Sequence, residues 1–529
     1  MVQRFLARAK NGDGEINPWV IALTVMLATF MEVLDTSIAN VALNHIAGSL
    51  SASVDESTWV LTSYLVSNAI ILPMSGWFSS LFGRKRFFMI CVALFTVTSF
   101  LCGLAPNLGS LIFFRVLQGI GGGAMQPIAQ AILVESFPHE KRGMGMAVYG
   151  MGVIFAPIIG PTLGGWITDN YSWRWIFFIN IPVGIFAILM TLYLIFDPPY
   201  LKRHSVREGL KIDYLGFSLL AVGLGALEIM LDEGQRNDWF ESGGITAAAI
   251  VAGLCLLAVV LWELHAEHPV VELRLLKNRN FTLATITMYF LGVVLYASTV
   301  LLPIYLQSLM GYNATLSGLV LSPGGVVVLF LMPIVGFLLS KYEARWLVTF
   351  GVAMCSLGMY QMAQFNLETD YHAAMMARIV QSVGMAFLFV PINTAAFSYL
   401  VKEQANNATG IINLARNIGG SSGIALTMTM LTRRTAFHQN MLAGHITGME
   451  ESYRSMIYGA GHMLVAQGSD PVQATQQAHG LMYGMLMRQS AMMGFVDSFW
   501  VLAMVFLLMI PLMFLMKKTR PQKMEVAAH

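Results

Sequence analysis

Fourteen long apolar stretches constrain what this chain can fold into more than any other feature. A helix that crosses a bilayer needs about 20 mostly apolar residues, and these stretches approach or exceed that length. Continuous runs of this kind exclude a transmembrane barrel, whose strands are shorter and alternate in polarity. The predicted limits are 19–44, 57–82, 87–105, 108–135, 144–168, 175–196, 214–232, 245–264, 281–306, 314–340, 346–365, 373–399, 408–431 and 497–516.

The composition leads to the same class of protein. Of 529 residues, 56% are hydrophobic and 11% are charged, whereas soluble proteins carry about 25% charged residues. An ordinary soluble enzyme is therefore excluded, because its surface requires more charge. The sequence predicts an all-α integral membrane protein with 14 transmembrane helices.

Lysine and arginine are concentrated in alternate loops, which predicts the orientation of the chain. With a cytoplasmic N-terminus, the short outside loops hold only Arg174 and Arg236. We therefore expect both termini on the inside. The net charge of +2 then reflects anchoring at the inner leaflet, and no nucleic-acid partner is expected.

Two patterns recur about 260 residues apart, which predicts an internal duplication. The run Pro73-Met74-Ser75-Gly76-Trp77 recurs as Pro333-Ile334-Val335-Gly336-Phe337, and Arg115 with Gln118 recurs as Arg378 with Gln381. Two parallel six-helix halves are typical of transporters. The predicted organisation is a cytoplasmic tail (1–18), a six-helix bundle (19–196), a cytoplasmic linker with two insert helices (197–280), a second six-helix bundle (281–516) and a cytoplasmic tail (517–529).

Residues 432–496 form a long outside loop in this scheme, rich in Met, Gln, His and Gly. Within it, 470–493 is compatible with an amphipathic helix that places Val472, Ala478, Leu481 and Met485 on one side. The loop is either a docking surface or outer cap, or a solvated segment.

Two acids in the first stretch are the strongest functional candidates. An ionisable side chain inside a membrane costs about 2.5–3.5 kcal/mol even on insertion scales. Glu32 and Asp35 stand three residues apart, on neighbouring turns of one face. Close carboxylates raise each other's proton affinity, and burial raises it further, so we expect proton carriers that face a central cavity. The alternative is a buried ion pair or a helix cap.

Other polar residues within the spans are candidates for lining a cavity. Glu228 lies on the first insert helix, and this helix lies outside the cavity if the insert is peripheral. Asp232 lies at the end of the same helix, and we expect it to have a structural role. The candidate cavity or substrate residues are Asn40, Gln118, Glu228, Arg378, Gln381 and Arg416.

The turn between the second and third stretches is a candidate gate. Gly76 and Gly83 permit a tight turn and close approach, and Arg84, Lys85 and Arg86 can hold helix C-termini or an acid on another helix. The alternative is plain anchoring by positive charge.

The stretch 144–168 combines small residues with two prolines. Small residues recur every four positions, at Gly152, Ala156, Gly160 and Gly164, and Gly165 follows. Pro157 and Pro161 lie on the adjoining stripe. Small residues let helices approach closely and prolines bend the backbone. We expect a tightly packed bend with a conformational role, against the alternative of simple packing.

Arg115 and Gln118 share one face of the fourth stretch, beside a close-approach face at Gly119 and Gly123. The arginine can bind a carboxylate of the first helix or hold a carbonyl. We expect it to couple proton loading to helix motion; structural pairing is the alternative.

No motif indicates a cofactor. There is no phosphate-binding Gly-Lys-Ser/Thr loop, and the four cysteines and the histidines of 432–496 lack metal-ligand spacing. We expect no metal and no cofactor, with energy supplied by a proton gradient.

At these residues the chain resembles the major facilitator superfamily. Within it, the chain resembles the fourteen-span drug:H⁺ antiporters, and in particular the EmrB-type multidrug exporters. The resemblance covers almost the whole chain. The matching segments are 34–43 of the first helix, the Gly-Pro run, Arg115, and 173–182. Three positions depart from the family pattern: Ser80 replaces an acid, and Glu32 and Glu228 stand where amides are expected. Extra cavity carboxylates would favour cationic substrates or add a second proton site.

The resemblance implies proton-driven export of hydrophobic or amphipathic drug-like compounds by alternating access. It also implies a multi-pass protein of the bacterial inner membrane that works with a periplasmic membrane-fusion adaptor and an outer-membrane channel. The alternatives are a proton-coupled symporter for a small organic solute and export of one metabolite such as a fatty acid. A membrane enzyme or sensor is disfavoured, because no catalytic constellation or output domain is evident.

Overall fold

The computed structural model describes residues 17–138, 141–197, 213–266, 269–339, 341–398, 400, 404–444, 446 and 450–517. Every regular element within these ranges is a helix, which confirms the predicted all-α class. The predicted tails lie almost wholly outside the described residues, as does 198–212 of the predicted linker.

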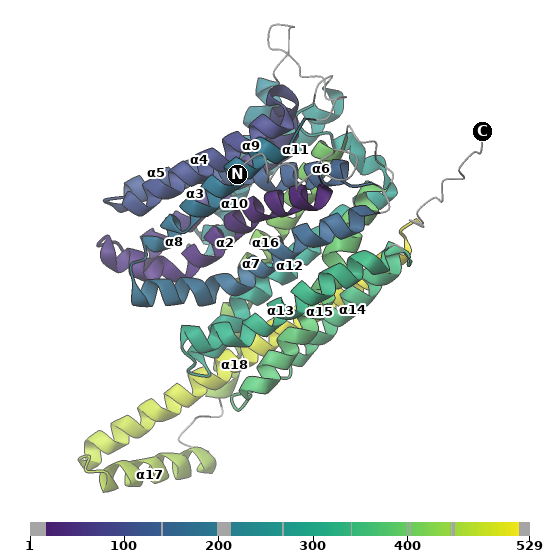
Figure 1. Cartoon of the computed structure of the whole chain (residues 1–529). Coiled ribbons are helices and arrows are strands. Elements are labelled where there is room, and N and C mark those ends of the chain that lie inside the picture. Colours follow the sequence, from purple (N-terminus) through teal and green to yellow (C-terminus); the bar gives the residue numbers. More distant parts are fainter. Residues whose placement is uncertain are drawn as a thin grey trace, which may run out of the picture.

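The first half of the chain forms a bundle of long helices (Figure 1). Side-chain caps explain several of the helix starts: Asn17 and Asn107 each accept a hydrogen bond from a backbone N–H of the first turn, and Ser53 with Glu56 forms a capping box. The helices are α2 (Pro18–Ser49), α3 (Val54–Phe82), α4 (Arg84–Leu104), α5 (Leu108–Gly123), α6 (Met125–Ser136), α7 (Arg142–Asn170), α8 (Trp175–Phe178) and α9 (Asn180–Leu194).

The predicted stretch 108–135 is divided into α5 and α6 at Ala124. Proline has no N–H, so Pro127 cannot donate to the carbonyl of Gly123, and the glycines before Ala124 have low helix propensity. The helix is therefore interrupted at Ala124, where the sequence predicted one continuous helix.

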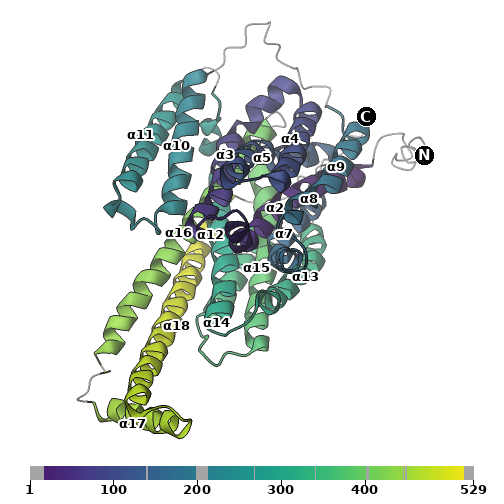
Figure 2. The same cartoon turned by 90° about the vertical axis from the view of Figure 1, so that its left-hand side faces the viewer.

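The remaining elements are α10 (Tyr214–Glu233), η3 (Trp239–Glu241), α11 (Gly243–His265), η4 (Leu273–Lys277), α12 (Arg279–Ser308), α13 (Ala314–Leu338), α14 (Ala344–Met362), α15 (Tyr371–Phe397), α16 (Ala405–Ala443), α17 (Glu451–Ala466) and α18 (Pro471–Phe514). Figure 2 shows α10 and α11 as a pair at the side of the bundle. Of this pair, α10 contacts α3 and α16.

Twelve spans in the described part of the chain are long and apolar enough to cross a membrane. Two of them join successive helices, α5 with α6 and α8 with α9. The helices α14 and α16 correspond to two further predicted stretches but are not among the twelve. In α16, polar side chains such as Asn413, Arg416 and Asn417 interrupt the apolar pattern.

The predicted loop 432–496 is mostly helical, which corrects the sequence interpretation. The helix α16 continues to Ala443, α17 follows, and α18 begins at Pro471 and runs without a break into the last predicted stretch. The three helices extend together beyond the bundle (Figures 1 and 2). Asp497 of α18 accepts a hydrogen bond from Arg434 of α16 and also contacts His438, which ties the two long helices together.

The predicted face of the amphipathic helix is also wrong. The buried side chains of this part of α18 follow a four-residue period, at Ala474, Ala478, Met482 and Leu486. Of the predicted set only Ala478 is buried, and Val472, Leu481 and Met485 are exposed. Packing against α16 and α17 selects the buried face, and hydrophobicity along one helix does not reveal its neighbours.

Candidate functional site

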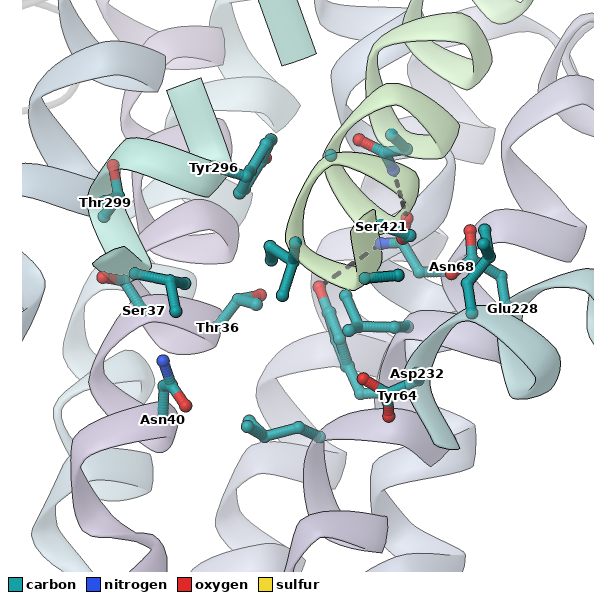
Figure 3. Close-up of a pocket in the computed structure, with 18 of the residues that line it drawn as sticks. Thr36, Ser37, Asn40, Tyr64, Asn68, Glu228, Asp232, Tyr296, Thr299 and Ser421 are labelled. Carbon is teal, nitrogen blue, oxygen red and sulfur yellow. Dashed lines mark hydrogen bonds between the residues drawn. The ribbon is translucent and has the colours of Figure 1, made fainter. Parts of the chain in front are cut away.

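A cavity of about 390 Å³ lies between helices α2–α9 of the N-terminal part of the chain and helices α12–α18 of the C-terminal part, which we call the two halves of the bundle. The cavity lies toward the end of the bundle that contains the C-termini of α2, α10 and α12 and the N-terminus of α3. The helix α17 lies on the same side (Figure 1), so we call this the α17 end. Side chains from α2, α3, α6, α7, α10, α12 and α16 line it, among them Asn40 and Tyr296 (Figure 3). A volume of this size is within the usual range for sites that bind small molecules.

Asp35 and Arg115 form a buried ion pair within the first half. The Arg115 Nη1 lies 2.6 Å from the Asp35 Oδ2, and both side chains are almost fully buried. The Arg115 Nη1 also donates to Gln118 at 2.9 Å and its Nε donates to the Val60 carbonyl at 2.9 Å. The arginine thus contacts both groups that the sequence proposed, a carboxylate of the first helix and a carbonyl.

The second oxygen of Asp35 is held by two amides. Its Oδ1 accepts from Asn180 at 2.6 Å and from Gln118 at 3.1 Å. The carboxylate is therefore fully hydrogen-bonded, as a buried charge requires.

Glu32 has a separate set of partners and belongs to the cavity wall. Its Oε1 accepts from Tyr64 at 3.1 Å and from Asn68 at 3.3 Å, and its Oε2 accepts from Gln126 at 2.6 Å. Gln126 in turn accepts a hydrogen bond from Arg416 of α16. A chain of polar groups thus connects Glu32 to the other half of the bundle.

The expectation that both acids face the cavity is wrong for Asp35, which does not line it. Three helical residues turn through about 300°, so the two side chains diverge by about 60° and reach different interfaces. Tyr64 lies between them: its hydroxyl bonds Glu32, and its ring lies 4.3 Å from the Arg115 guanidinium carbon.

Contacts between the halves continue from the cavity toward the opposite end of the bundle. Asn417 donates to Asn68 at 3.3 Å, and Asn413 donates to Gln130 at 3.0 Å. Further along, Gly76 of α3 lies so close to Asn407 of α16 that a Cβ on Gly76 would overlap the Asn407 side chain. The helices α3 and α16 therefore touch at this end, whereas at the α17 end both contribute to the cavity wall.

The turn between α3 and α4 is pinned to neighbouring helices. Gly83 has φ of 82°, a conformation that favours glycine. Arg84 pairs with Glu135 of α6, and Lys85 donates from its backbone to Asp197 at 2.8 Å and from its Nζ to the Leu192 carbonyl at 2.6 Å. Two of the three cations thus grip an acid and a helix C-terminus, and Arg86 is exposed.

The small-residue stripe of α7 packs against α2. A Cβ on Gly152 would press on Met26, on Gly160 it would overlap Ser37, and on Gly164 it would press on Ile38; Gly165 is also buried. Because Pro161 lacks an N–H, the Pro157 carbonyl is released from the helix ladder, and the Ser37 hydroxyl donates to it at 3.2 Å. Both prolines line the cavity.

The insert helix α10 forms part of the cavity wall, so it is not peripheral. Its residues Glu228, Leu231 and Asp232 line the cavity, as does Gln235 just after the helix, and the spacing of the three helical residues places them on one face. Glu228 is buried beside Ser421 of α16, and Asp232 accepts a hydrogen bond from Thr62 of α3. Figure 3 shows both acids on the side opposite Ser37 and Thr299.

The repeated pair Arg378 and Gln381 does not line the cavity, contrary to expectation. Arg378 donates to Gln381 at 2.6 Å and to Ser298 at 3.1 Å, and Gln381 donates to Ser298 at 2.7 Å. This cluster repeats the geometry of Arg115, Gln118 and Asp35 with a serine at the place of the acid. Arg416 does not line the cavity either; it lies behind Gln126.

No group of three or more His, Cys, Asp or Glu side chains that could hold a metal occurs in the described ranges. Within the same ranges, Cys91, Cys102 and Cys355 are free and buried.

Sequence reasoning missed the amides and the tyrosine that complete the site. Tyr64, Asn68, Gln126, Asn180 and Asn417 carry the hydrogen bonds described above. A signal was present: Gln126 with Gln130 and Asn413 with Asn417 are polar pairs spaced by four residues within largely apolar helices, which is the pattern of a polar interface.

A helical bundle with a repeated Arg–Gln pair, a buried acid–arginine pair and a cavity between its halves defines a polytopic membrane transporter. The chain belongs to the Major Facilitator Superfamily, whose family pattern matches residues 25–424. It is 36% identical to the multidrug export protein EmrB of Escherichia coli (strain K12), over 94% of this chain and 95% of that protein. It is 37% identical to the fatty acid resistance protein FarB of Neisseria gonorrhoeae, over 94% of this chain and 96% of that protein.

These relatives confirm the EmrB-type resemblance. Among solved structures, the proton:xylose symporter XylE superposes with a TM-score of 0.61 at 14% identity, covering 95% of this chain and 96% of that one. This likeness supports the superfamily fold.

Proposed function

We propose that this transporter exports hydrophobic or amphipathic drug-like compounds in exchange for protons. The observation that supports this proposal most directly is the pair of acids on α2. Asp35 forms an ion pair with Arg115 in the first half, and Glu32 lines the cavity. Tyr64 contacts both Glu32 and Arg115. The multidrug export relative at 36% identity supports export as the direction of substrate movement.

In the proposed mechanism, protonation of Asp35 weakens the charge-assisted bond to Arg115. Arg115 also holds the Val60 carbonyl of α3, so its release loosens α2 from α3 and α5. Protonation of Glu32 removes the charge that orients Gln126 toward Arg416 of the other half. Proton loading at the two acids thereby changes how the halves pack, as alternating access requires.

We further propose fourteen spans, with α14 and α16 added to the twelve apolar ones, and both termini in the cytoplasm. The distribution of Lys and Arg supports this orientation. The cavity then opens toward the periplasm of a bacterial inner membrane. The organisation would be two six-helix halves with α10 and α11 inserted between them.

A periplasmic adaptor and an outer-membrane channel complete the proposal for partners. In the proposed orientation, the extension formed by α16, α17 and α18 projects into the periplasm at the cavity end (Figure 1). Exposed apolar side chains on it, including Val472, Leu481 and Met485, suit a protein contact.

Substrate-triggered proton release from proteoliposomes with a preset pH gradient tests the function. We expect candidate drugs to collapse the gradient with the wild type, and Asp35→Asn to reduce the rate by at least about a hundredfold, equivalent to ~2.7 kcal/mol. Drugs that never collapse the gradient, or an Asp35→Asn variant that behaves as wild type, would refute the mechanism.

Export of a fatty acid is the second candidate, because a fatty acid resistance protein is 37% identical to this chain. An apolar cavity side formed by Leu61, Leu65 and Ile424 would accept an acyl chain. The same proteoliposome measurement with laurate separates the candidates. Gradient collapse by laurate and not by drugs, at a rate above that in protein-free liposomes, supports the fatty acid. Symport has no comparable support, since the XylE likeness concerns the fold.

A further inference from the structure

The cavity has more negative than positive side chains. Among the described residues that line it, the carboxylates are Glu32, Glu228 and Asp232, and the one cation is Arg236. Arg236 lies in the turn after α10, where it contacts Thr58 and Glu233. Its guanidinium is therefore already shared between a hydroxyl and another acid.

The three carboxylates differ in how well they are paired. Glu32 accepts three hydrogen bonds, and Asp232 accepts one from Thr62. Glu228 is 3% exposed, yet its Oε1 has no hydrogen-bond partner and it takes part in no ion pair within the described residues. Its polar neighbour is the Ser421 hydroxyl of α16, and the charged group that acts on it is the Asp232 carboxylate one turn away on α10.

A buried carboxylate without a positive partner is expensive, and a like charge beside it increases that cost. This energetic cost is relieved if the carboxylate binds a proton or if a cation enters the cavity. An anionic ligand would instead be repelled by whichever of the three carboxylates are ionised, and Arg236 is already engaged with Thr58 and Glu233. The electrostatics of the cavity therefore select against anions and favour cations.

The surroundings suit a cation attached to a large apolar body. Tyr296 and Tyr64 present aromatic rings to the cavity, and Leu61, Leu65 and Met428 present apolar side chains. Aromatic faces attract organic cations, and apolar walls with a few charged groups are usual in small-molecule sites.

We propose that the Glu228–Asp232 face of α10 binds the positively charged group of amphipathic organic cations, while the rest of the cavity holds their apolar part. This rests on the proposed export function and names its substrate class. It also gives the insert helices a role in substrate recognition, with Glu228 as the specificity-determining residue.

Equilibrium binding of matched probes to the purified full chain in nanodiscs tests the proposal. Tetraphenylphosphonium is a cation, tetraphenylborate has nearly the same shape and is an anion, and triphenylphosphine oxide is an uncharged relative. We expect wild type to bind the cation about tenfold or more tightly than the anion. Glu228→Gln should lower the ratio of cation to neutral affinity about tenfold, and Glu228→Asp should lower it less. Glu241→Gln, an exposed acid outside the cavity, is the matched control, and thermal unfolding of each variant checks its fold.

An unchanged cation-to-neutral ratio in Glu228→Gln, or equal wild-type affinity for cation and anion, would overturn the inference. Proton release driven by triphenylphosphine oxide in proteoliposomes adds a second readout. If Glu228→Gln abolishes it as Asp35→Asn does, Glu228 carries protons and the inference is also overturned. If no probe of any charge releases protons with wild type, the proposed function fails, whereas selective cation binding is judged separately by the affinities.

Discussion

The two acids of α2 have different surroundings although only three residues separate them. Asp35 is enclosed by Arg115, Asn180 and Gln118 within one half of the bundle, whereas Glu32 is bonded to groups that lead into the other half. A proton on Asp35 would alter contacts within a half. A proton on Glu32 would alter contacts between the halves. It would also change the charge of the cavity, because Glu32 lines it.

Glu32→Gln tests this difference. The amide resembles the protonated acid in shape but cannot gain or lose a proton, so we expect transport to depend less steeply on pH and the substrate range to change. Each charge-assisted hydrogen bond lost is worth about 1.5–3 kcal/mol. The measurement is the initial rate of substrate-driven proton release over a range of external pH. Glu368→Gln, an exposed acid, serves as control, and identical pH profiles for Glu32→Gln and wild type would contradict the role.

At the scale of elements, α7 combines a weakened helix ladder with close packing. Pro161 releases the Pro157 carbonyl, and Ser37 of α2 satisfies it. Gly160 brings the two backbones together at the same level. The weakened part of α7 therefore packs on α2, the helix that carries both acids, and we expect motion of one helix to move the other.

Gly160→Ala tests the packing of α7 on α2. The new methyl group would overlap the Ser37 side chain, and overpacking of this kind costs about 1–3 kcal/mol. We expect a lower unfolding midpoint in detergent micelles and slower transport. Gly484→Ala in α18, where a Cβ would meet nothing, should leave the midpoint unchanged or raise it slightly. A Gly160→Ala protein as stable and active as Gly484→Ala would refute the packing role.

At the scale of the whole molecule, the halves are closed at one end and parted by the cavity at the other. The helices α3 and α16 meet at Gly76 and Asn407, while Leu61 of α3 and Ile424 of α16 lie on the cavity wall. If the two halves rock against each other, the contact between Gly76 and Asn407 must open when the cavity closes.

Cysteines at Gly76 and Asn407 test this motion. A Cβ on Gly76 would lie 3.4 Å from the Asn407 Cα, which is compatible with a disulfide. We expect oxidation of the Gly76→Cys/Asn407→Cys protein to reduce transport in proteoliposomes at least about tenfold, or ~1.4 kcal/mol, and reduction to restore it. Each single cysteine variant is the control. Full transport by the quantitatively crosslinked protein would show that α3 and α16 do not separate.

The sequence alone determined the class of protein, nearly all the membrane helices and the repeated Arg–Gln pair, because apolar runs and short motifs are local properties of the chain. It also indicated that Arg115 binds a carboxylate of the first helix or a carbonyl, since a membrane arginine requires such a partner.

Only the tertiary structure decided which acid faces the cavity, that α10 forms part of its wall, that Arg378 and Gln381 lie away from it, and that 432–496 continues as helices. Each of these depends on how far a helix is rotated about its axis and which distant segment packs against it. Local hydrophobicity carries no record of either, because residues such as Glu32 and Arg416 become neighbours only through the packing of the two halves.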